Sequence, residues 1–302
     1  MSNVELAMMP GCFVSRVSGD SMKILTKNYK HAAFVVTAVV LATFAVIAGL
    51  SCKPSPAGYK SNTEAIQLNE SGMQCYQTGQ YERANMYFER AIEADPANPA
   101  PWFNKGQTMD AERKYDDAVT AYDKAVQLDP NFADAWSGKA LAYYNLDQND
   151  KAMEAIQKAI SIKDNVAQYW DNKGLVLMNQ QDYQGAATAF AKASSLDPLS
   201  PEYWTWEANA QVMSRQFDAA LVSSDKALSL NENNALAWGY KAKALHELRR
   251  YDEALIAFDK GLALAPNEPA LWYSKGLTLE TLHRDTEAQK CYDKARSLGY
   301  KF

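Results

Sequence analysis

The residue types that most often carry out chemistry are few in this chain of 302 residues and form no recognisable motif. Its three histidines are His31, His246 and His283, and none belongs to a metal-binding H-E-x-x-H sequence. The four cysteines include no C-x-x-C pair, and the sequence lacks a G-x-S-x-G nucleophile motif and a glycine-rich phosphate loop. The sequence therefore predicts a protein that is not an enzyme, with no catalytic residues, no metal site and no cofactor.

Carboxylates are the most numerous charged groups, and their excess disfavours one class of partner. The chain carries 36 Asp and Glu against 31 Lys and Arg, and residues 65–302 carry 33 against 25, a net charge of −8. Nucleic acid binds to basic stripes that neutralise its phosphates, so we expect no nucleic-acid partner. A neutral or basic protein segment is the partner that this charge favours.

Six evenly spaced tryptophans indicate the elements that position the polar groups. They stand 34 residues apart, at Trp102, Trp136, Trp170, Trp204, Trp238 and Trp272. A period of 34 residues is that of a two-helix unit stacked many times. The frame divides the chain without insertion into seven units, which are 65–98, 99–132, 133–166, 167–200, 201–234, 235–268 and 269–302.

The unit 99–132 shows how each repeat is built. Spacings of three and four place its apolar residues on one side of two successive helices. These residues are Trp102, Gly106 and Met109 in the first helix and Tyr115, Ala118, Tyr122 and Ala125 in the second. Pro130 ends the second helix because proline cannot continue the backbone hydrogen bonds.

The repeated pattern resembles the tetratricopeptide repeat family. Tryptophan is followed by Gly or Ala four residues later and by alanine twelve after that, and an aromatic, a second alanine and proline come next. The resemblance covers residues 65–302 and implies an all-α fold of antiparallel helix pairs, wound into a right-handed superhelical solenoid. Ser224 departs from the aromatic, Asp164 and Glu232 from the proline, and Leu68 from the tryptophan. We expect slightly looser packing at these junctions.

The resemblance also implies that the first helix of each pair lines a concave groove for a peptide or protein partner. Aromatic side chains are common anchors at interfaces, and asparagine can both donate to and accept from a peptide backbone. The residues expected to bind are Tyr76, Phe103, Asn104, Asp110, Asp134, Tyr144, Asn145, Asp171, Asn172, Trp206, Asn209, Tyr240 and Tyr273. The alternative for any one aromatic is that it packs against the neighbouring helix.

The charges expected in this groove are unequal. One lysine, Lys243, faces seven carboxylates, which are Glu70, Asp110, Asp134, Asp171, Glu202, Glu247 and Glu280. The lysine- and arginine-rich clamp with which chaperone-binding members of the family hold a terminal carboxylate is absent.

A second set of lysines recurs just before the small residue of the first helix, at Lys105, Lys139, Lys173, Lys241 and Lys275. An anionic ligand is one interpretation. We prefer ion pairs with acids such as Asp123, Asp225 or Asp259, with the alkyl stems covering apolar surface.

The N-terminal part of the chain predicts a membrane connection. Residues 32–50 carry no charge, so we expect a transmembrane helix or a signal-peptide core at 32–51, behind a basic segment at 1–31 and before a linker at 52–64. A buried soluble helix is the alternative. Four basic residues precede this stretch and two follow it, which favours repeats on the extracytoplasmic side.

Two features of the same segment leave its processing open. Met22 precedes basic residues as a true start would. Cys52 follows Gly49-Leu50-Ser51, which resembles a bacterial lipobox except that the leucine lies two residues before the cysteine rather than three. A lipid on Cys52 would anchor the protein without a spanning helix.

The last repeat, which runs to Phe302, lacks the covering helix that is common in the family. Either its outer face is polar, or it packs on a second copy or a partner. The alternatives to a binding scaffold are therefore a self-associating structural protein and a non-catalytic accessory subunit of an envelope enzyme complex.

Overall fold

The computed structural model describes residues 63–301, and within this range every element is an α-helix. The helices are α2 (Thr63–Gln77), α3 (Tyr81–Ala94), α4 (Pro99–Ala111), α5 (Tyr115–Leu128), α6 (Ala133–Asn145), α7 (Asn149–Ile162), α8 (Ala167–Asn179), α9 (Tyr183–Leu196), α10 (Pro201–Met213), α11 (Phe217–Leu230), α12 (Ala235–Glu247), α13 (Tyr251–Leu264), α14 (Pro269–Thr281) and α15 (Asp285–Ser297). The all-α prediction is confirmed for these residues. The predicted hydrophobic helix at 32–51 and the lipidation candidate Cys52 lie outside them.

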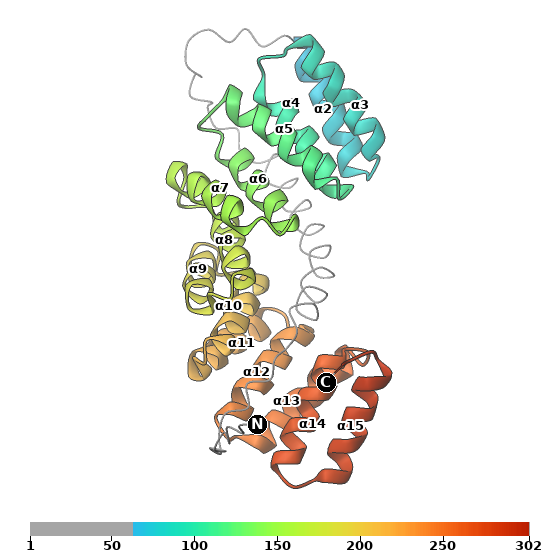
Figure 1. The fold of residues 1–302 in the computed structure, drawn as a ribbon, viewed down its shortest axis with the longest axis vertical. Coiled ribbons are helices and arrows are strands. Elements are labelled where there is room, and N and C mark those ends of the chain that lie inside the picture. The colour runs from blue at the N-terminus through green and yellow to red at the C-terminus, as the bar shows by residue number, and fades with distance from the viewer. Residues whose placement is uncertain (1–62, 302) are drawn as a thin grey trace, which may run out of the picture. The chain divides into compact units, whose positions relative to one another are not determined.

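The helices form pairs that follow one another in chain order, from α2 and α3 to α14 and α15 (Figure 1). We call the even-numbered members first helices and the odd-numbered members second helices. Each second helix also packs on the first helix of the next pair. The described residues are therefore a solenoid, in which each repeat buries its apolar face mainly against its neighbours.

The two sides of the stack differ in how closely consecutive repeats approach. First helices contact one another directly at α2–α4, α4–α6, α6–α8, α10–α12 and α12–α14. No two successive second helices in residues 63–301 make comparable contacts. The first helices thus form one surface, which we call the first-helix face, and α8 and α10 approach each other less closely than the other successive first helices do.

The periodic tryptophans lock consecutive repeats together. The indole N–H groups of five of them, from Trp136 to Trp272, each donate to the backbone carbonyl six residues earlier, at 2.7–3.1 Å. At Asp164 and Glu232, which replace proline, these distances are 2.7 and 2.9 Å. The loosening expected at these two residues is not seen in this contact, because the carbonyl oxygen that the indole binds is present in any residue.

Small residues in the first helices make room for the large residues of the second. A methyl group on Gly174 would lie 2.6 Å from the Phe190 ring, and Gly72, Gly106 and Gly276 face Phe88, Tyr122 and Tyr292 in the same way. All four aromatic side chains lie between the helices of their own pair. A larger residue at these glycines would force the ring out of its place.

The fifth repeat has a polar interior. Ser224, where other repeats have an aromatic, is fully buried. Glu207 replaces the recurrent lysine and is 6% exposed. Its carboxylate accepts hydrogen bonds from Ser194 at 2.7 Å, Gln211 at 2.9 Å and Ser223 at 3.1 Å. These hydrogen bonds join the fifth repeat to Ser194 of the preceding one, beside the apolar packing of Ala227 and Leu228.

The outer face of α15 is polar. Leu255 and Leu262 of α13 are 8% and 6% exposed, because the next repeat covers them. The corresponding residues of α15, 34 positions later, are Gln289 and Arg296, and both are exposed. Of the two alternatives for the last repeat, the structure therefore favours a face that water can solvate.

Candidate functional site

The residues predicted to line a groove all belong to first helices, but they differ widely in exposure. Asp134 is exposed, and the partly exposed members are Tyr76, Phe103, Asp110, Asn145, Trp206, Asn209, Tyr240 and Tyr273. The buried members are Asn104, Tyr144, Asp171 and Asn172, with 5–8% of their surface exposed. The first-helix face therefore offers about two thirds of the predicted set to a partner without rearrangement.

Tyr144 is the clearest correction among the aromatics. The sequence predicts an exposed anchor, yet the side chain is 6% exposed and packs with Ala152 and Val176. It fills space between the third and fourth repeats, because the first helices α6 and α8 are in contact there. Tyr144 therefore contributes to the core, and the prediction that it is exposed is wrong.

The other aromatics are half-buried, with one part of the ring packed on a neighbour. The Phe103 ring lies 5.0 Å from that of Phe132, and the Tyr273 ring stacks 4.7 Å from that of Tyr300. The Trp206 ring stacks on Phe190 at 6.5 Å. Packing thus fixes each ring in place while leaving part of it exposed, which lowers the entropy that an anchor loses on binding.

Hydrogen bonds between successive first helices join residues that are 35 positions apart. The Asn104 amide donates to Asn69 Oδ1 at 2.9 Å, and the Asn172 amide donates to Ser137 Oγ at 2.9 Å. The Tyr169 hydroxyl donates to Asp134 Oδ1 at 2.5 Å. Asn104 and Asn172 were predicted to bind a peptide backbone, but the structure buries them in this ladder because their amides join neighbouring repeats.

Two carboxylates in the set, the partly exposed Asp110 and the buried Asp171, have unusual environments. Asp110 accepts from the Tyr122 hydroxyl at 2.7 Å, and Asp171 accepts from Gln168 at 3.1 Å. In each, the other carboxylate oxygen, Oδ1, has no hydrogen-bond partner among the described residues. Burial raises the pKa of both carboxyl groups to about 7; these hydrogen bonds oppose the shift, and the charge of Glu202 adds to it at Asp171.

The single groove lysine lies in the sixth repeat. The Lys243 ammonium is 5.8 Å from the centre of the Tyr240 ring, and burial lowers its pKa while the charge of Glu268 opposes this shift. On the same helix, His246 Nδ1 is 3.0 Å from Thr278 Oγ1, and burial lowers the pKa of its imidazole. Burial therefore makes both of these groups on α12 less basic, and Glu247 on the same helix adds a negative charge near His246.

Four of the five recurrent lysines pair with acids of the preceding second helix, as predicted. Lys139 and Lys241 bind Asp123 and Asp225 at 2.6 Å. Lys105 binds Glu89 at 2.8 Å and Lys275 binds Asp259 at 2.5 Å. Lysine ammoniums also lie 4.9–5.9 Å from the centres of Trp136, Trp170, Trp238 and Trp272. An anionic ligand is not needed to explain this row.

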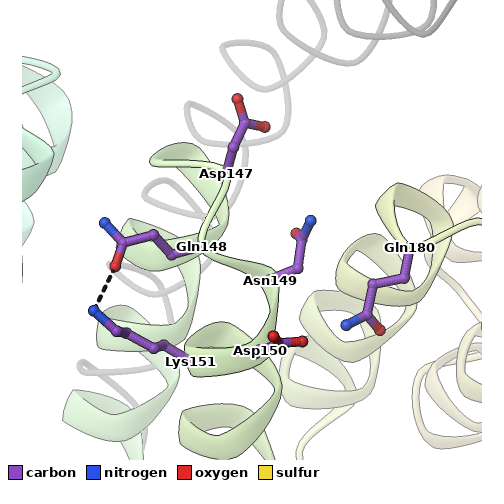
Figure 2. Close-up of a pocket in the computed structure, with 6 residues that line it drawn as sticks. All are labelled: Asp147, Gln148, Asn149, Asp150, Lys151 and Gln180. Atoms are coloured by element: carbon purple, nitrogen blue, oxygen red, sulfur yellow. Dashed lines mark hydrogen bonds between the residues drawn. The ribbon is translucent and has the colours of Figure 1, made fainter.

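An open hollow between the third and fourth repeats is a weaker candidate site. It is lined by Asp147, Gln148, Asn149, Asp150, Lys151 and Gln180. Figure 2 shows Lys151 bound to Gln148 and the Asp147 side chain directed away from Asp150, so the polar groups do not converge. Within residues 63–301 no group of histidine, cysteine and acidic side chains could hold a metal ion.

Some residues that shape the site were not identified from the sequence. Gln168 donates to both Asp171 and Asn172 at 3.1 Å. The Tyr203 hydroxyl, whose pKa burial raises further above its usual range, lies within the electrostatic influence of Asp171. The signal that could have found the Gln168 contacts is the helical spacing of three and four residues, which places Gln168, Asp171 and Asn172 on one side of α8.

The comparisons with known families agree with the fold. Models described as tetratricopeptide repeats match residues 68–98, 87–120 and 133–166, and a TPR repeat model matches 112–147. A model described as anaphase-promoting complex, cyclosome, subunit 3 matches residues 179–261. The chain belongs to the tetratricopeptide repeat family. A search of curated proteins found no match.

Solved structures with low sequence identity share the fold. A tetratricopeptide repeat protein from Parabacteroides merdae aligns with a TM-score of 0.60 at 18% identity, over 80% of this chain and 95% of that one. YrrB, described as having an unusual peptide-binding site, aligns at 0.55 and 20%, over 62% and 97%. The Cut9–Hcn1 assembly of the APC/C aligns at 0.60 and 20%, over 72% of this chain but only 43% of that chain. At these identities the likeness establishes the architecture alone.

Proposed function

We propose that this protein is a membrane-tethered scaffold whose first-helix face holds a neutral or basic segment of another protein. In this proposal the repeats wind into a right-handed superhelix, with the first helices on its concave side. Family members such as YrrB, whose description names a peptide-binding site, support a protein or peptide as the ligand. The excess of carboxylates over residues 65–302 supports the neutral or basic character of the segment.

The observation that carries this proposal is the set of half-buried aromatic rings on the first-helix face. Trp206 is held by its stacking on Phe190, and Tyr273 by its stacking on Tyr300. Rigid aromatic groups that are partly exposed are the side chains that most often dominate binding at interfaces. A segment lying along the face could contact rings from several repeats at once.

Removing two of these rings tests the assignment. We expect Trp206→Ala with Tyr240→Ala to weaken capture of a partner at least tenfold, because each anchor typically contributes more than about 1 kcal/mol. The measurement is a pull-down from a detergent extract of native membranes, followed by titration with the partner recovered. Undiminished capture by this double variant would reject the first-helix face as the binding surface.

A matched control removes apolar surface from the opposite side. Val222 and Ile256 lie on second helices and are 68% and 60% exposed. The pair Val222→Ala and Ile256→Ala should leave capture unchanged, and both double variants should keep the helical circular dichroism of the parent. A loss in the control equal to that in the test would place the binding surface elsewhere.

The tether is the second part of the proposal and is supported by the sequence of residues 32–51. This stretch carries no charge, and Cys52 follows it. Within residues 63–301 no helix is long and apolar enough to cross a membrane. We infer that the repeats lie on the extracytoplasmic side, held by a spanning helix or by a lipid on Cys52. Intact-mass analysis of the native N-terminus distinguishes the two, and a cleaved chain without a lipid adduct would remove the tether.

A further inference from the structure

Two neighbouring first helices, α10 and α12, carry partly exposed residues at equivalent repeat positions (Figure 1). On α10 these residues are Trp206 and Asn209, and 34 positions later on α12 they are Tyr240 and Lys243. A spacing of three residues places both members of each pair on one side of their helix. Because α10 and α12 contact each other directly, the four residues form one part of the first-helix face, which we call the paired-ring patch.

Three polar groups of the paired-ring patch are not used within the fold. The Trp206 indole N–H, the Asn209 amide and the Lys243 ammonium have no hydrogen-bond or ion-pair partner among the described residues. This separates Trp206 from the periodic tryptophans, five of which donate the indole N–H to a backbone carbonyl. An indole and an ammonium can only donate hydrogen bonds, and an amide can donate as well as accept. The patch therefore presents mainly donors to a ligand.

The same two repeat positions on the flanking first helices lack this combination. On α8 the Asn172 amide is buried and already donates to the preceding first helix, and Leu175 is apolar. On α14 the Ser274 hydroxyl donates to a backbone carbonyl of its own helix at 2.8 Å, and Leu277 is apolar. Neither helix has an aromatic residue at these positions. Rings and unused donors thus coincide on α10 and α12 and not on their two neighbours.

The charges around the paired-ring patch favour an uncharged ligand. Glu202 lies in the first turn of α10, Glu247 is the last residue of α12, and Glu268 is close enough to influence Lys243. These carboxylates repel an acidic ligand, and the Lys243 ammonium repels a basic one. Backbone carbonyls are acceptors without a net charge. A segment whose carbonyls are not bonded within itself therefore suits the donors of the patch.

The spacing of the two helices selects the conformation of such a segment. Packed helices have axes roughly 8–10 Å apart, so equivalent residues on α10 and α12 repeat at about that distance. A polyproline II helix has three residues per turn and rises ~3.1 Å per residue, so it presents the same side every ~9 Å. A β-strand presents the same side every ~6.6 Å. Two turns of an α-helix span ~11 Å, but its carbonyls are bonded within the helix. The polyproline II conformation combines the matching period with free carbonyls.

We propose that the paired-ring patch binds a proline-rich segment of the partner in the polyproline II conformation. Prolines three residues apart pack on the Trp206 and Tyr240 rings, and backbone carbonyls of the segment accept from Trp206 Nε1, Asn209 and Lys243. Proline suits this patch because its fixed φ reduces the entropy lost on binding, and because it has no backbone N–H that would need an acceptor. This inference rests on the proposed function and names the class of segment that the first-helix face holds.

The test begins with a phage-displayed library of random dodecapeptides, selected on the detergent-solubilised full chain. Enriched peptides are synthesised unchanged, with each proline replaced by alanine, and with one residue inserted between the prolines. Their affinities are measured by fluorescence anisotropy for the parent, Trp206→Phe, Lys243→Met and Gln107→Ala. The first variant keeps a ring without the N–H, and the second keeps an unbranched side chain without the ammonium. Gln107 is partly exposed at the equivalent position of Asn209 on α4, so its variant controls for the loss of a polar group outside the patch.

We expect the enriched peptides to share prolines three residues apart. Replacing either proline by alanine should weaken binding about tenfold, because one ring loses its contact. One inserted residue should have a similar effect, because it turns the second proline away from its ring by roughly a third of a turn. Trp206→Phe and Lys243→Met should each weaken binding about threefold to tenfold, the usual share of one hydrogen bond. Gln107→Ala should change the affinity less than about twofold, and circular dichroism should show that all three variants are folded.

Other outcomes overturn the inference in distinguishable ways. Peptides that lose affinity on Trp206→Ala with Tyr240→Ala, but contain no prolines at this spacing, would support the first-helix face and reject a proline-rich ligand. Proline-dependent peptides that bind the parent, Trp206→Phe and Lys243→Met equally would reject the paired-ring patch as their site. A shared aspartate or glutamate whose removal has no effect in Lys243→Met would make the ligand acidic. Failure of every peptide to enrich would contradict the proposed function, and this inference would fall with it.

Discussion

Asp171 and Glu207 are both buried carboxylates on first helices, but they differ in how well they are satisfied. Glu207 accepts three hydrogen bonds, from Ser194, Gln211 and Ser223. Asp171 accepts one and leaves an oxygen without a partner. Glu207 therefore contributes to the stability of its repeat, whereas the ionised form of Asp171 costs stability. The two residues give opposite expectations on mutation.

Asp171→Asn should stabilise the protein in a manner that depends on pH. Burial raises the pKa of Asp171 to about 7, above its ordinary value of 3.8, so the fold favours the neutral acid. The stability that Asp171 contributes is complete below pH 4 and is lost as the pH rises through 7. We expect the variant to gain about 1–3 kcal/mol over the parent at pH 8 and much less at pH 5. Urea denaturation at both values measures this difference, and a gain that does not grow with pH would contradict a neutral Asp171.

Glu207→Ala should have the opposite effect. The substitution leaves the Ser223 hydroxyl and the Gln211 amide without their acceptor, and Ser194 of the preceding repeat keeps only its bond to the Ala191 carbonyl. We expect a loss of about 2–4 kcal/mol in the free energy of unfolding, since unsatisfied buried groups and a cavity both destabilise. Glu207→Gln keeps the shape of the side chain and one acceptor oxygen, so its free energy of unfolding should fall by less. Equal losses in the two variants would mean that the hydrogen bonds of Glu207 are not what stabilises this repeat.

At the level of the helices, the turn within each pair uses a residue in the left-handed region. These residues are Gly79, Arg113, Asp147, Gln181, Arg215, Arg249 and His283, with φ between 57° and 73°. Only the first is a glycine. A left-handed conformation costs a residue with a side chain about 1–2 kcal/mol. The turn is thus set by the helix pairing, which imposes the same backbone on unfavourable residues in six repeats.

Gln181→Gly should therefore stabilise the protein, although glycine usually destabilises. Gln181 is exposed with φ 63°, and its backbone N–H donates to the Met178 carbonyl at 3.1 Å. We expect a gain of about 0.5–1 kcal/mol, the relief of strain less the entropy that glycine loses on folding. The matched control is Gly79→Gln at the equivalent turn, which should lower the free energy of unfolding by a similar amount. Denaturant midpoints that moved in the same direction for both would contradict this account.

At the level of the whole molecule, the array is a chain of neighbour contacts whose last described helix presents a polar face. Gln289 and Arg296 stand where Leu255 and Leu262 are covered by a following repeat. The replacement of two apolar residues by polar ones removes the surface that would draw another copy onto α15. This polar surface argues against self-association through α15 and supports the proposal that binding uses the first-helix face.

Placing apolar residues at these two positions of α15 should make the protein associate with itself through that helix. We expect Gln289→Leu with Arg296→Leu to dimerise at micromolar concentrations through α15, because the variant exposes apolar surface of the kind that consecutive repeats bury. Light scattering of the detergent-solubilised full chain checks this, with Gln289→Asn and Arg296→Lys as a polar control. A parent protein that already dimerises, with the control pair unable to change it, would favour the self-associating alternative.

Much of the solenoid could be predicted from particular residues. The 34-residue period of the tryptophans is a local signal repeated six times, and five of the indoles bind the end of the preceding repeat with similar geometry. The ion pairs of Lys139, Lys241 and Lys275 could also be foreseen, because their partners recur at a fixed spacing. The periodicity of the sequence predicts these contacts because each repeat contacts mainly the next one.

The exposure of the candidate binding residues could not be predicted in the same way. Tyr144, Asn104 and Asn172 share repeat positions with residues expected to face a partner, yet contact between successive first helices buries them. Burial at these positions depends on how closely two first helices approach, and that distance is set by side chains on both helices together. A repeat pattern describes each position separately and carries no such information.

The sequence alone determined the repeat length, the helical character and the acidic balance, because these follow from the spacing and the type of single residues. The tertiary structure alone decided which predicted binding residues are buried, and that Asp171 Oδ1 has no donor where Asn69 and Ser137 have one. The physical reason is that a missing hydrogen bond is a property of two surfaces brought together, and it exists only once packing has excluded water from between them.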